Sequence, residues 1–166
     1  TMCCTAMGFQ ARYVIDWTDH VWTEVYSKNL GRWIHCDSCE NSFDGPLMYE
    51  AGWGKGLSYV VAYSVSGVAD VTRRYTRKWH EVVKRRNHVS EEWLKQTIES
   101  INYQLDIFKT PDQLNWIQMQ RVEEEKELSS NGSGAELKPE ELQGRISGSE
   151  EWKVCCKESC FFAHFF

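Results

Sequence analysis

The chain lacks the sequence signals of secretion and of membrane insertion. Its first residues do not show a positively charged segment followed by an apolar one, as a secretory signal would. The longest apolar stretch, residues 57–69, is interrupted by tyrosine and serine and is too short to span a bilayer. The sequence starts with a threonine instead of a methionine, so we expect the natural amino terminus to lie upstream.

Two further features are missing, and each excludes a class of protein. The seven cysteines are odd in number and unevenly spread, which argues against a closed disulfide framework and favours a reducing, cytosolic setting. The net charge is -5, so the sequence has no overall polyanion-binding character. No internal repeat is present, and 166 residues are enough for one domain.

Tryptophan, in contrast, is abundant, with eight copies in a chain that is 42% apolar. A flat indole ring stacks on sugar faces, so tryptophan can line a carbohydrate or peptide groove. It also fills core and interface volume, which is its more frequent use. Composition alone leaves both interpretations open.

The order of predicted elements indicates an α+β fold. Strands and hairpins are predicted at residues 9–17, 21–26, 32–37, 57–64 and 68–75. Ser90 is a predicted N-cap, and apolar residues then recur at spacings of three and four up to Phe108. Thr110 to Gln113 has the pattern of a capping box with proline at the first helical position. We therefore expect an antiparallel sheet followed by C-terminal helices.

The turn after the second strand predicts which side chains meet across the sheet. A four-residue loop, Ser27 to Leu30, places Tyr26 opposite Gly31 and His20 opposite Asp37. Because side chains alternate between faces, one face collects six polar and aromatic residues. These are His20, Trp22, Glu24, Trp33, His35 and Asp37. The other face is small and aliphatic and is expected to be the core surface; it holds Val21, Thr23, Val25, Ile34 and Cys36.

The His20–Asp37 pair has the chemistry of a hydrolytic site. A histidine and an aspartate on neighbouring strands are close enough to form a hydrogen bond. The carboxylate fixes the imidazole tautomer and stabilises the imidazolium, while the other ring nitrogen remains free for proton transfer. A purely structural pair is the alternative, and a shift of the register by one residue would separate the two side chains.

Several stretches resemble the peptide N-glycanase core, a transglutaminase-like, papain-related fold. They are residues 8–14 (GFQARYV), 16–24 (DWTDHVWTE), 32–40 (RWIHCDSCE), 47–50, 52–53, 57–60, 70–75 and 141–149. The resemblance covers roughly residues 1–153, and the run DHVWTE makes it specific.

The resemblance implies a reaction and a set of site residues. The family cleaves the side-chain amide that joins an N-linked glycan to asparagine, using a Cys–His–Asp triad. His20 matches the catalytic histidine and Asp37 the catalytic aspartate. Arg12, Trp22, Glu24 and Trp33 match positions that the family needs around the site. The roles of Arg12 and Glu24 stay open, and an ion pair that supports the strands is the alternative.

The resemblance also implies what residues 1–166 do not contain. The family nucleophile is a cysteine in a Gly-Arg-Cys-Gly-Glu-Trp motif at a helix N-terminus, and this motif does not occur here. The family's zinc-binding Cys-x-x-Cys pairs also lie upstream, so we expect no metal or other cofactor in this chain. Cys4 matches a later cysteine of the nucleophile helix. The chain is thus expected to be a fragment of a hydrolase, inactive alone, and its status as an enzyme is left open.

The same resemblance suggests domain boundaries, partners and a location. Residues 1–128 are expected to form a partial transglutaminase-like core with C-terminal helices, 129–149 a Ser/Gly linker and 150–166 a divergent tail. The family acts on misfolded N-glycoproteins in the cytoplasm, in glycoprotein catabolism and ER-associated degradation. Its members also bind ubiquitin-like receptors that deliver substrates to the proteasome.

Three alternatives to the amidase interpretation remain. The chain could be a non-catalytic module that binds glycopeptide or a partner. It could also bind DNA, as degenerate transglutaminase domains related to Rad4 do, through the basic residues between Arg73 and Arg86. We interpret these basic residues instead as a solvated helix face, and expect no nucleic acid. Cys36 and Cys39 could form half of a zinc site or a redox pair, but tetrahedral zinc needs four ligands, and an inert thiol is favoured for Cys36.

Overall fold

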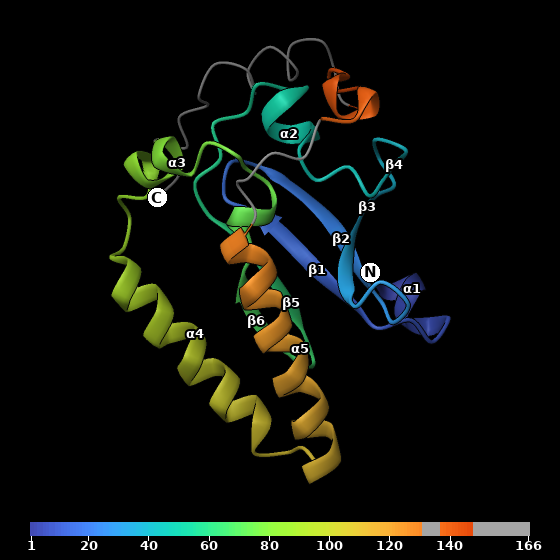
Figure 1. Cartoon of the computed structure of the whole chain (residues 1–166), viewed down its shortest axis with the longest axis vertical. Coiled ribbons are helices and arrows are strands. Elements are labelled where there is room, and N and C mark those ends of the chain that lie inside the picture. The colour runs from blue at the N-terminus through green and yellow to red at the C-terminus, as the bar shows by residue number, and fades with distance from the viewer. Residues whose placement is uncertain (131–136, 148–166) are drawn as a thin grey trace.

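The computed structural model describes residues 1–130 and 137–147, and in this part of the chain six strands form one antiparallel sheet (Figure 1). The strand order is β4-β3-β2-β1-β5-β6. The strands are β1 (Ala11–Asp16), β2 (His20–Ser27), β3 (Arg32–Asp37), β4 (Ser42–Phe43), β5 (Val60–Ser64) and β6 (Gly67–Asp70). Residues 131–136 and 148–149 of the predicted linker and all of the predicted tail lie outside the described residues.

Among the described helices, one short helix precedes the sheet, one lies between β4 and β5, and the others follow β6. They are α1 (Met2–Ala6), α2 (Met48–Ala51), η1 (Thr72–Arg74), α3 (Trp79–Arg85), α4 (Glu91–Asp106), α5 (Pro111–Ser130) and η2 (Pro139–Leu142). Ser90 caps α4 by accepting a hydrogen bond from the Trp93 amide, and Thr110 and Gln113 form the reciprocal bonds of a capping box. The predicted α+β class, with an antiparallel sheet followed by helices, is confirmed.

The two long helices contact different parts of the sheet. In Figure 1, α4 and α5 diverge from the turn that joins them. The α4 helix lies against the edge strand β6, where the Asn102 amide group bonds to the backbone of Val68 in both directions. The α5 helix contacts β3 and η1, and therefore reaches the middle of the sheet. None of the described helices is long and apolar enough to cross a bilayer.

The register between β2 and β3 differs from the prediction by two residues. Tyr26 lies opposite Trp33, where Gly31 was expected, and Glu24 lies opposite His35. The cause is the turn, which begins one residue later than predicted and keeps Gly31 out of the strand at a φ of +63°. A glycine adopts this left-handed conformation without the steric cost that a side chain brings. Because the shift is even, every side chain stays on its predicted face.

The prediction of which face packs into the core is wrong for most of the aliphatic face, where Ile34 alone of the five residues is buried. The six polar and aromatic residues are all between 0 and 8% exposed, whereas Val21 on the aliphatic face is 43% exposed. Helices α2 and α5 and the turn η1 cover the polar face and bring partners for its charges. The hydrophobic core lies on this face and includes Val14, Trp22, Met48, Tyr49, Trp53, Leu57, Val60, Ala62, Val71 and Tyr75. Cys36, on the opposite face, is only half-buried, and its partial burial raises the pKa of its thiol to about 11.

Candidate active site

His20 and Asp37 lie at the ends of adjacent strands and are hydrogen-bonded. His20 begins β2 and Asp37 ends β3, and the distance from His20 Nε2 to Asp37 Oδ2 is 2.7 Å. In the observed register Thr23 is opposite Cys36, so His20 reaches Asp37 diagonally and not from directly across. Diagonal neighbours are within reach of a side chain as long as histidine. Both residues are buried.

Asp37 accepts four hydrogen bonds, which is the usual capacity of a carboxylate. Oδ2 accepts from His20 and from the Tyr49 hydroxyl at 2.9 Å, and Oδ1 accepts from the backbone amides of Cys39 and Glu40. Burial alone would raise the pKa of Asp37, but these donors, His20 first, outweigh it and lower the pKa. The charged carboxylate therefore holds the proton of His20 on Nε2.

The other nitrogen of His20, Nδ1, has no hydrogen bond to any described residue. Three aromatic rings surround the imidazole: the ring centroids of Trp22, Tyr49 and Trp53 lie 5.8, 5.4 and 4.9 Å from its own. On β1 its register partner is Asp16, which forms a buried ion pair with Lys55 at 2.6 Å. With Nε2 held by Asp37, Nδ1 is the nitrogen that can exchange a proton with a reactant.

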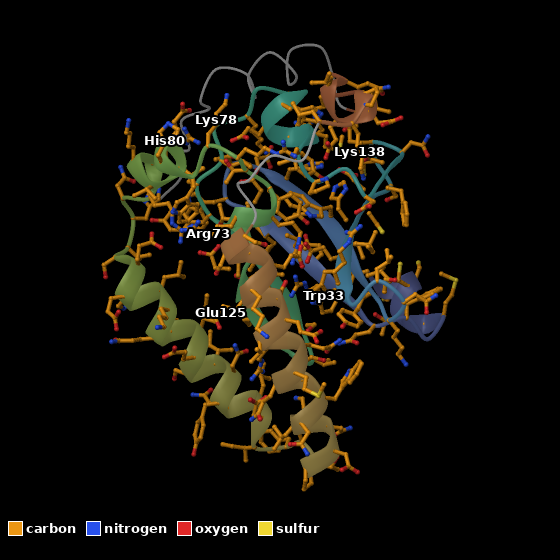
Figure 2. The ribbon with its side chains drawn as sticks, in the orientation of Figure 1. Trp33, Arg73, Lys78, His80, Glu125 and Lys138 are labelled. Atoms are coloured by element: carbon orange, nitrogen blue, oxygen red, sulfur yellow. The ribbon has the colours of Figure 1, made fainter. Side chains whose placement is uncertain are left out.

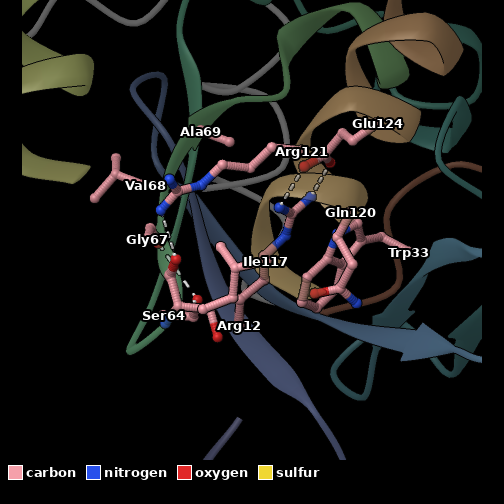
Figure 3. Close-up of a pocket in the computed structure, with 11 residues that line it drawn as sticks. Arg12, Trp33, Ser64, Gly67, Val68, Ala69, Ile117, Gln120, Arg121 and Glu124 are labelled. Atoms are coloured by element: carbon pink, nitrogen blue, oxygen red, sulfur yellow. Dashed lines mark hydrogen bonds and ion pairs between the residues drawn. The ribbon is translucent and has the colours of Figure 1, made fainter. Parts of the chain in front are cut away.

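The predicted site residues Arg12 and Glu24 belong to a separate group of charges on the same sheet face. We call Arg12, Glu24, Arg74 and Glu124 the ionic cluster. Arg12 Nε lies 2.5 Å and Arg74 Nη1 2.9 Å from the Glu24 carboxylate, and Arg74 Nη2 lies 2.8 Å from Glu124. Figure 3 shows the Arg12 guanidinium directed at both oxygens of Glu124 on α5.

The ionic cluster is buried and its charges are matched. Burial raises the pKa of Glu24, but the charges of Arg12 and Arg74 and the hydroxyl of Tyr75 outweigh it and lower the pKa to about 2. Glu24 therefore stays ionised at neutral pH, and so do the two guanidinium groups. Because Glu124 lies on α5, the cluster ties that helix to the sheet. The structure thus favours the supporting role for Arg12 and Glu24 that the sequence left open.

Trp22 and Trp33 are both buried, and each connects parts of the site. Trp22 stacks on Tyr49 with centroids 4.4 Å apart, and its Nε1 donates to the Tyr75 hydroxyl, which in turn donates to Glu24. It therefore links the His20–Asp37 pair with the ionic cluster. The Arg12 guanidinium lies 4.0 Å from the centroid of the Trp33 ring. Trp33 lies next to α5, beside a cavity of about 30 Å³ whose walls include Arg12 and Gln120 (Figures 2 and 3).

Three residues around this site were not assigned a role from the sequence: Tyr49, Arg74 and Glu124. Arg74 was included in a basic stretch predicted to be a solvated helix face. That prediction is wrong for Arg74 and also for Arg86, which is buried and paired with Asp70 and Glu91. The remaining basic stretch includes Arg73, Lys78 and, beside them, His80, which gather around η1 and α3 in Figure 2. No sequence spacing identifies Glu124, which is 112 residues from Arg12.

The described cysteines and acidic residues do not build a metal site. Cys3, Cys4, Cys36 and Cys39 are free thiols, and none of the four is hydrogen-bonded to His20. Within residues 1–130 and 137–147, no three or more His, Cys, Asp or Glu side chains are grouped so as to hold a metal ion. Cys155, Cys156 and Cys160 lie outside the described residues.

Comparisons with known proteins agree with this fold. The family model of the Rad4 transglutaminase-like domain matches residues 16–128. The crystal structure of Rad4–Rad23 bound to a 6-4 photoproduct UV lesion superimposes with a TM-score of 0.50 and 19% identity, covering 84% of this chain and 34% of that one. At this identity, the likeness concerns the fold alone.

Curated relatives share far more of the sequence. Peptide-N(4)-(N-acetyl-beta-glucosaminyl)asparagine amidase of Rattus norvegicus is 48% identical over 160 residues, which are 96% of this chain and 24% of that protein. The human protein of the same name is 50% identical over 93% of this chain and 23% of its own length, and the Arabidopsis thaliana protein is 41% identical over 95% and 22%. The chain spans about a quarter of the length of these relatives. It belongs to the Rad4 transglutaminase-like domain family, and within that family it is similar to the peptide N-glycanases.

Proposed function

We propose that this chain supplies the histidine and the aspartate of a peptide N-glycanase, an amidase that removes N-linked glycans from asparagine. The observation that carries the proposal is the state of His20: Nε2 is fixed by Asp37, and Nδ1 has no partner among the described residues. The similarity to relatives that bear the amidase name supports the choice of reaction.

In the proposed reaction His20 moves a proton twice. Nδ1 accepts the thiol proton of a cysteine nucleophile, and the thiolate sulfur attacks the side-chain amide carbon of the glycosylated asparagine. The carbon–nitrogen bond breaks, and the imidazolium gives its proton to the departing glycosylamine. Water then hydrolyses the thioester, leaving aspartate and the free thiol. Asp37 stabilises the imidazolium throughout these steps.

The nucleophile belongs, in this proposal, to a part of the protein outside residues 1–166. The Gly-Arg-Cys-Gly-Glu-Trp motif is absent from the sequence, and no described cysteine is bonded to His20. The 166-residue chain alone is therefore expected to be inactive, and no zinc or other cofactor is assigned to it. Misfolded N-glycoproteins in the cytoplasm, within ER-associated degradation, are the proposed substrates, and ubiquitin-like proteasome shuttle receptors are the proposed partners.

The test compares the chain alone with a chimera. In the chimera, this chain replaces the matching quarter of the rat relative, so that the remainder of that protein supplies the upstream region. Each protein is incubated with a denatured high-mannose glycoprotein, and mass spectrometry follows loss of the glycan and conversion of asparagine to aspartate. We expect conversion by the chimera, and none by the chain alone or by a chimera carrying His20→Ala.

Two outcomes would contradict parts of this proposal. Conversion by the chain alone would place the nucleophile within residues 1–166, and Cys3 and Cys4 would be substituted next. A folded chimera that binds glycopeptide without cleaving it would favour a non-catalytic binding module instead.

A further inference from the structure

Asp37 is hydrogen-bonded to Tyr49, and Tyr49 is in turn hydrogen-bonded to His35, deeper in the core. The Tyr49 hydroxyl lies 2.9 Å from Asp37 Oδ2 and 2.7 Å from His35 Nε2. The Gly45 amide nitrogen lies 3.3 Å from His35 Nδ1. Both side chains are almost fully buried, Tyr49 at 0% and His35 at 1% exposed. The proton transfer proposed for His20 makes no use of these two groups.

The backbone amide of Gly45 fixes the direction of the hydrogen bonds that run from it through His35 and Tyr49 to Asp37. An amide N–H can only donate, so Nδ1 of His35 is the acceptor, and the neutral ring carries its proton on Nε2. Nε2 then donates to the Tyr49 oxygen, which leaves the hydroxyl proton of Tyr49 to be donated to Asp37. The tautomer of His35 thus fixes the orientation of the Tyr49 hydroxyl.

The protonation states agree with this direction. Burial lowers the pKa of His35 to about 4, so the ring is neutral at pH 7. Burial, followed by the charge of Asp37, raises the pKa of Tyr49 well above its usual value, so the hydroxyl keeps its proton. No net charge is added beside Asp37, only a donor with a fixed direction.

We propose that Tyr49, oriented by His35, is a positioning residue that shares Oδ2 of Asp37 with His20 and so moderates how strongly the carboxylate holds the imidazolium. The proposal rests on the proposed function for its catalytic meaning. An oxygen that accepts two hydrogen bonds is a weaker base than one that accepts a single bond. The imidazolium of His20 then gives up its proton to the leaving amine more readily than it would beside an unshared carboxylate.

The other charged groups near the pair are already held by partners. Around His20 these are Asp37 on β3 and Asp16 on β1, the latter paired with Lys55. Around His35 they are Asp37, Glu24, Asp44 and His20, and Glu24 and Asp44 are paired with arginines. The hydroxyl of Tyr49 is therefore the group that can be removed without changing the charge around His20.

The experiment is a titration of the histidine rings by nitrogen-15 NMR in the whole 166-residue chain. We expect the titration midpoint of His20 to rise by about 0.5 to 1 pH unit in Tyr49→Phe, because Asp37 then accepts one donor fewer. Tyr75→Phe is the matched control: it removes another buried hydroxyl on the same face, which donates to Glu24 and not to Asp37. Its effect on His20 is expected to be below about 0.2 pH unit. An unchanged or lowered midpoint in Tyr49→Phe would overturn the proposal.

A second measurement needs no substitution, in case Tyr49→Phe does not fold. In the wild-type chain, the ring nitrogens of His35 should report the neutral ring with its proton on Nε2 at pH 6 to 8. A proton on Nδ1, or a charged ring at pH 6, would overturn the proposed orientation of Tyr49. Neither measurement depends on activity, so an inactive chimera would contradict the proposed function and leave this result standing.

Discussion

Two groups of polar side chains share the buried face of the sheet, and they differ in how completely they are partnered. The ionic cluster sets two arginines against two glutamates, and each carboxylate bonds to both guanidinium groups. The His20–Asp37 pair saturates the carboxylate but leaves one histidine nitrogen without a bond among the described residues. A fully matched network holds geometry, whereas a group that must move a proton needs one position left open.

The two groups are adjacent on one strand. His20 and Glu24 both belong to β2 and point to the same face, with Trp22 between them. Trp22 bonds through Tyr75 to Glu24 on one side and stacks on Tyr49 on the other. The ionic cluster can therefore position the His20–Asp37 pair from the same face of the sheet.

The largest effect on stability is expected from Glu24→Gln. The substitution removes a buried negative charge and leaves Arg12 and Arg74 with only part of their compensation. Breaking a buried pair in this way costs about 3 to 5 kcal/mol in the free energy of unfolding. Urea denaturation of the 166-residue chain at pH 7 measures it.

Glu127→Gln is the matched control for that variant. Glu127 also pairs with Arg74, but its side chain is 25% exposed. A loss of less than about 1 kcal/mol is expected there. Equal losses for the two variants would contradict the distinction between buried and peripheral members of the network.

The second effect is a pH dependence of stability that arises from His35. Its pKa falls from 6.5 to about 4 on folding because burial disfavours the charged ring. As the pH falls, His35 is therefore protonated in the unfolded chain before it is protonated in the folded chain. Its contribution to the free energy of unfolding is complete above pH 6.5 and is lost as the pH falls toward 4. The loss amounts to roughly 3 kcal/mol at its limit.

His35→Gln isolates this contribution because glutamine does not titrate. Between pH 7 and pH 4.5 its free energy of unfolding should change less than that of the wild type. Glu24 does not interfere over most of this window, because its pKa falls from 4.5 to about 2 and its contribution is lost only at lower pH. Parallel pH profiles for wild type and variant would show that His35 is not the group responsible.

The smallest effect is expected at the partly exposed pair of Arg32 and Asp44. The pair has two hydrogen bonds of 2.8 Å, but the Arg32 side chain is 37% exposed. Asp44→Asn should cost about 1 kcal/mol or less, and the cost should shrink as salt is added. A loss as large as that of Glu24→Gln would mean that burial is not what separates the two pairs.

Local patterns predicted the class of fold, which side chains share a face of β2 and β3, and the contact between His20 and Asp37. The register was displaced by two residues because Gly31 takes a left-handed conformation in the turn, which spacing alone does not reveal. The contact survived because an even displacement keeps side chains on their faces. The catalytic roles of the two residues remain predictions.

The partners of the buried charges could not be predicted from local patterns. Glu24 and His35 were placed on the face opposite the predicted core because they are polar, and their burial is compensated by contacts with Arg12, Arg74 and Tyr49. Glu124 lies on α5, 112 residues from Arg12 along the chain, and no period or motif in the sequence indicates that the two side chains meet. Charges that are far apart in the sequence, such as those of Arg74 and Glu124, are paired only once the chain has folded.

The most direct test of the account is the rate of deglycosylation by the chimera with and without Asp37→Asn, at equal concentrations of folded protein. Asparagine has nearly the same shape but carries no charge to stabilise the imidazolium, so we expect the rate to fall by about two orders of magnitude. The control Asp44→Asn should keep nearly the full rate. An Asp37→Asn chimera that is folded and nearly as active as the wild-type chimera would contradict the assignment of His20 and Asp37 as the proton-transferring pair.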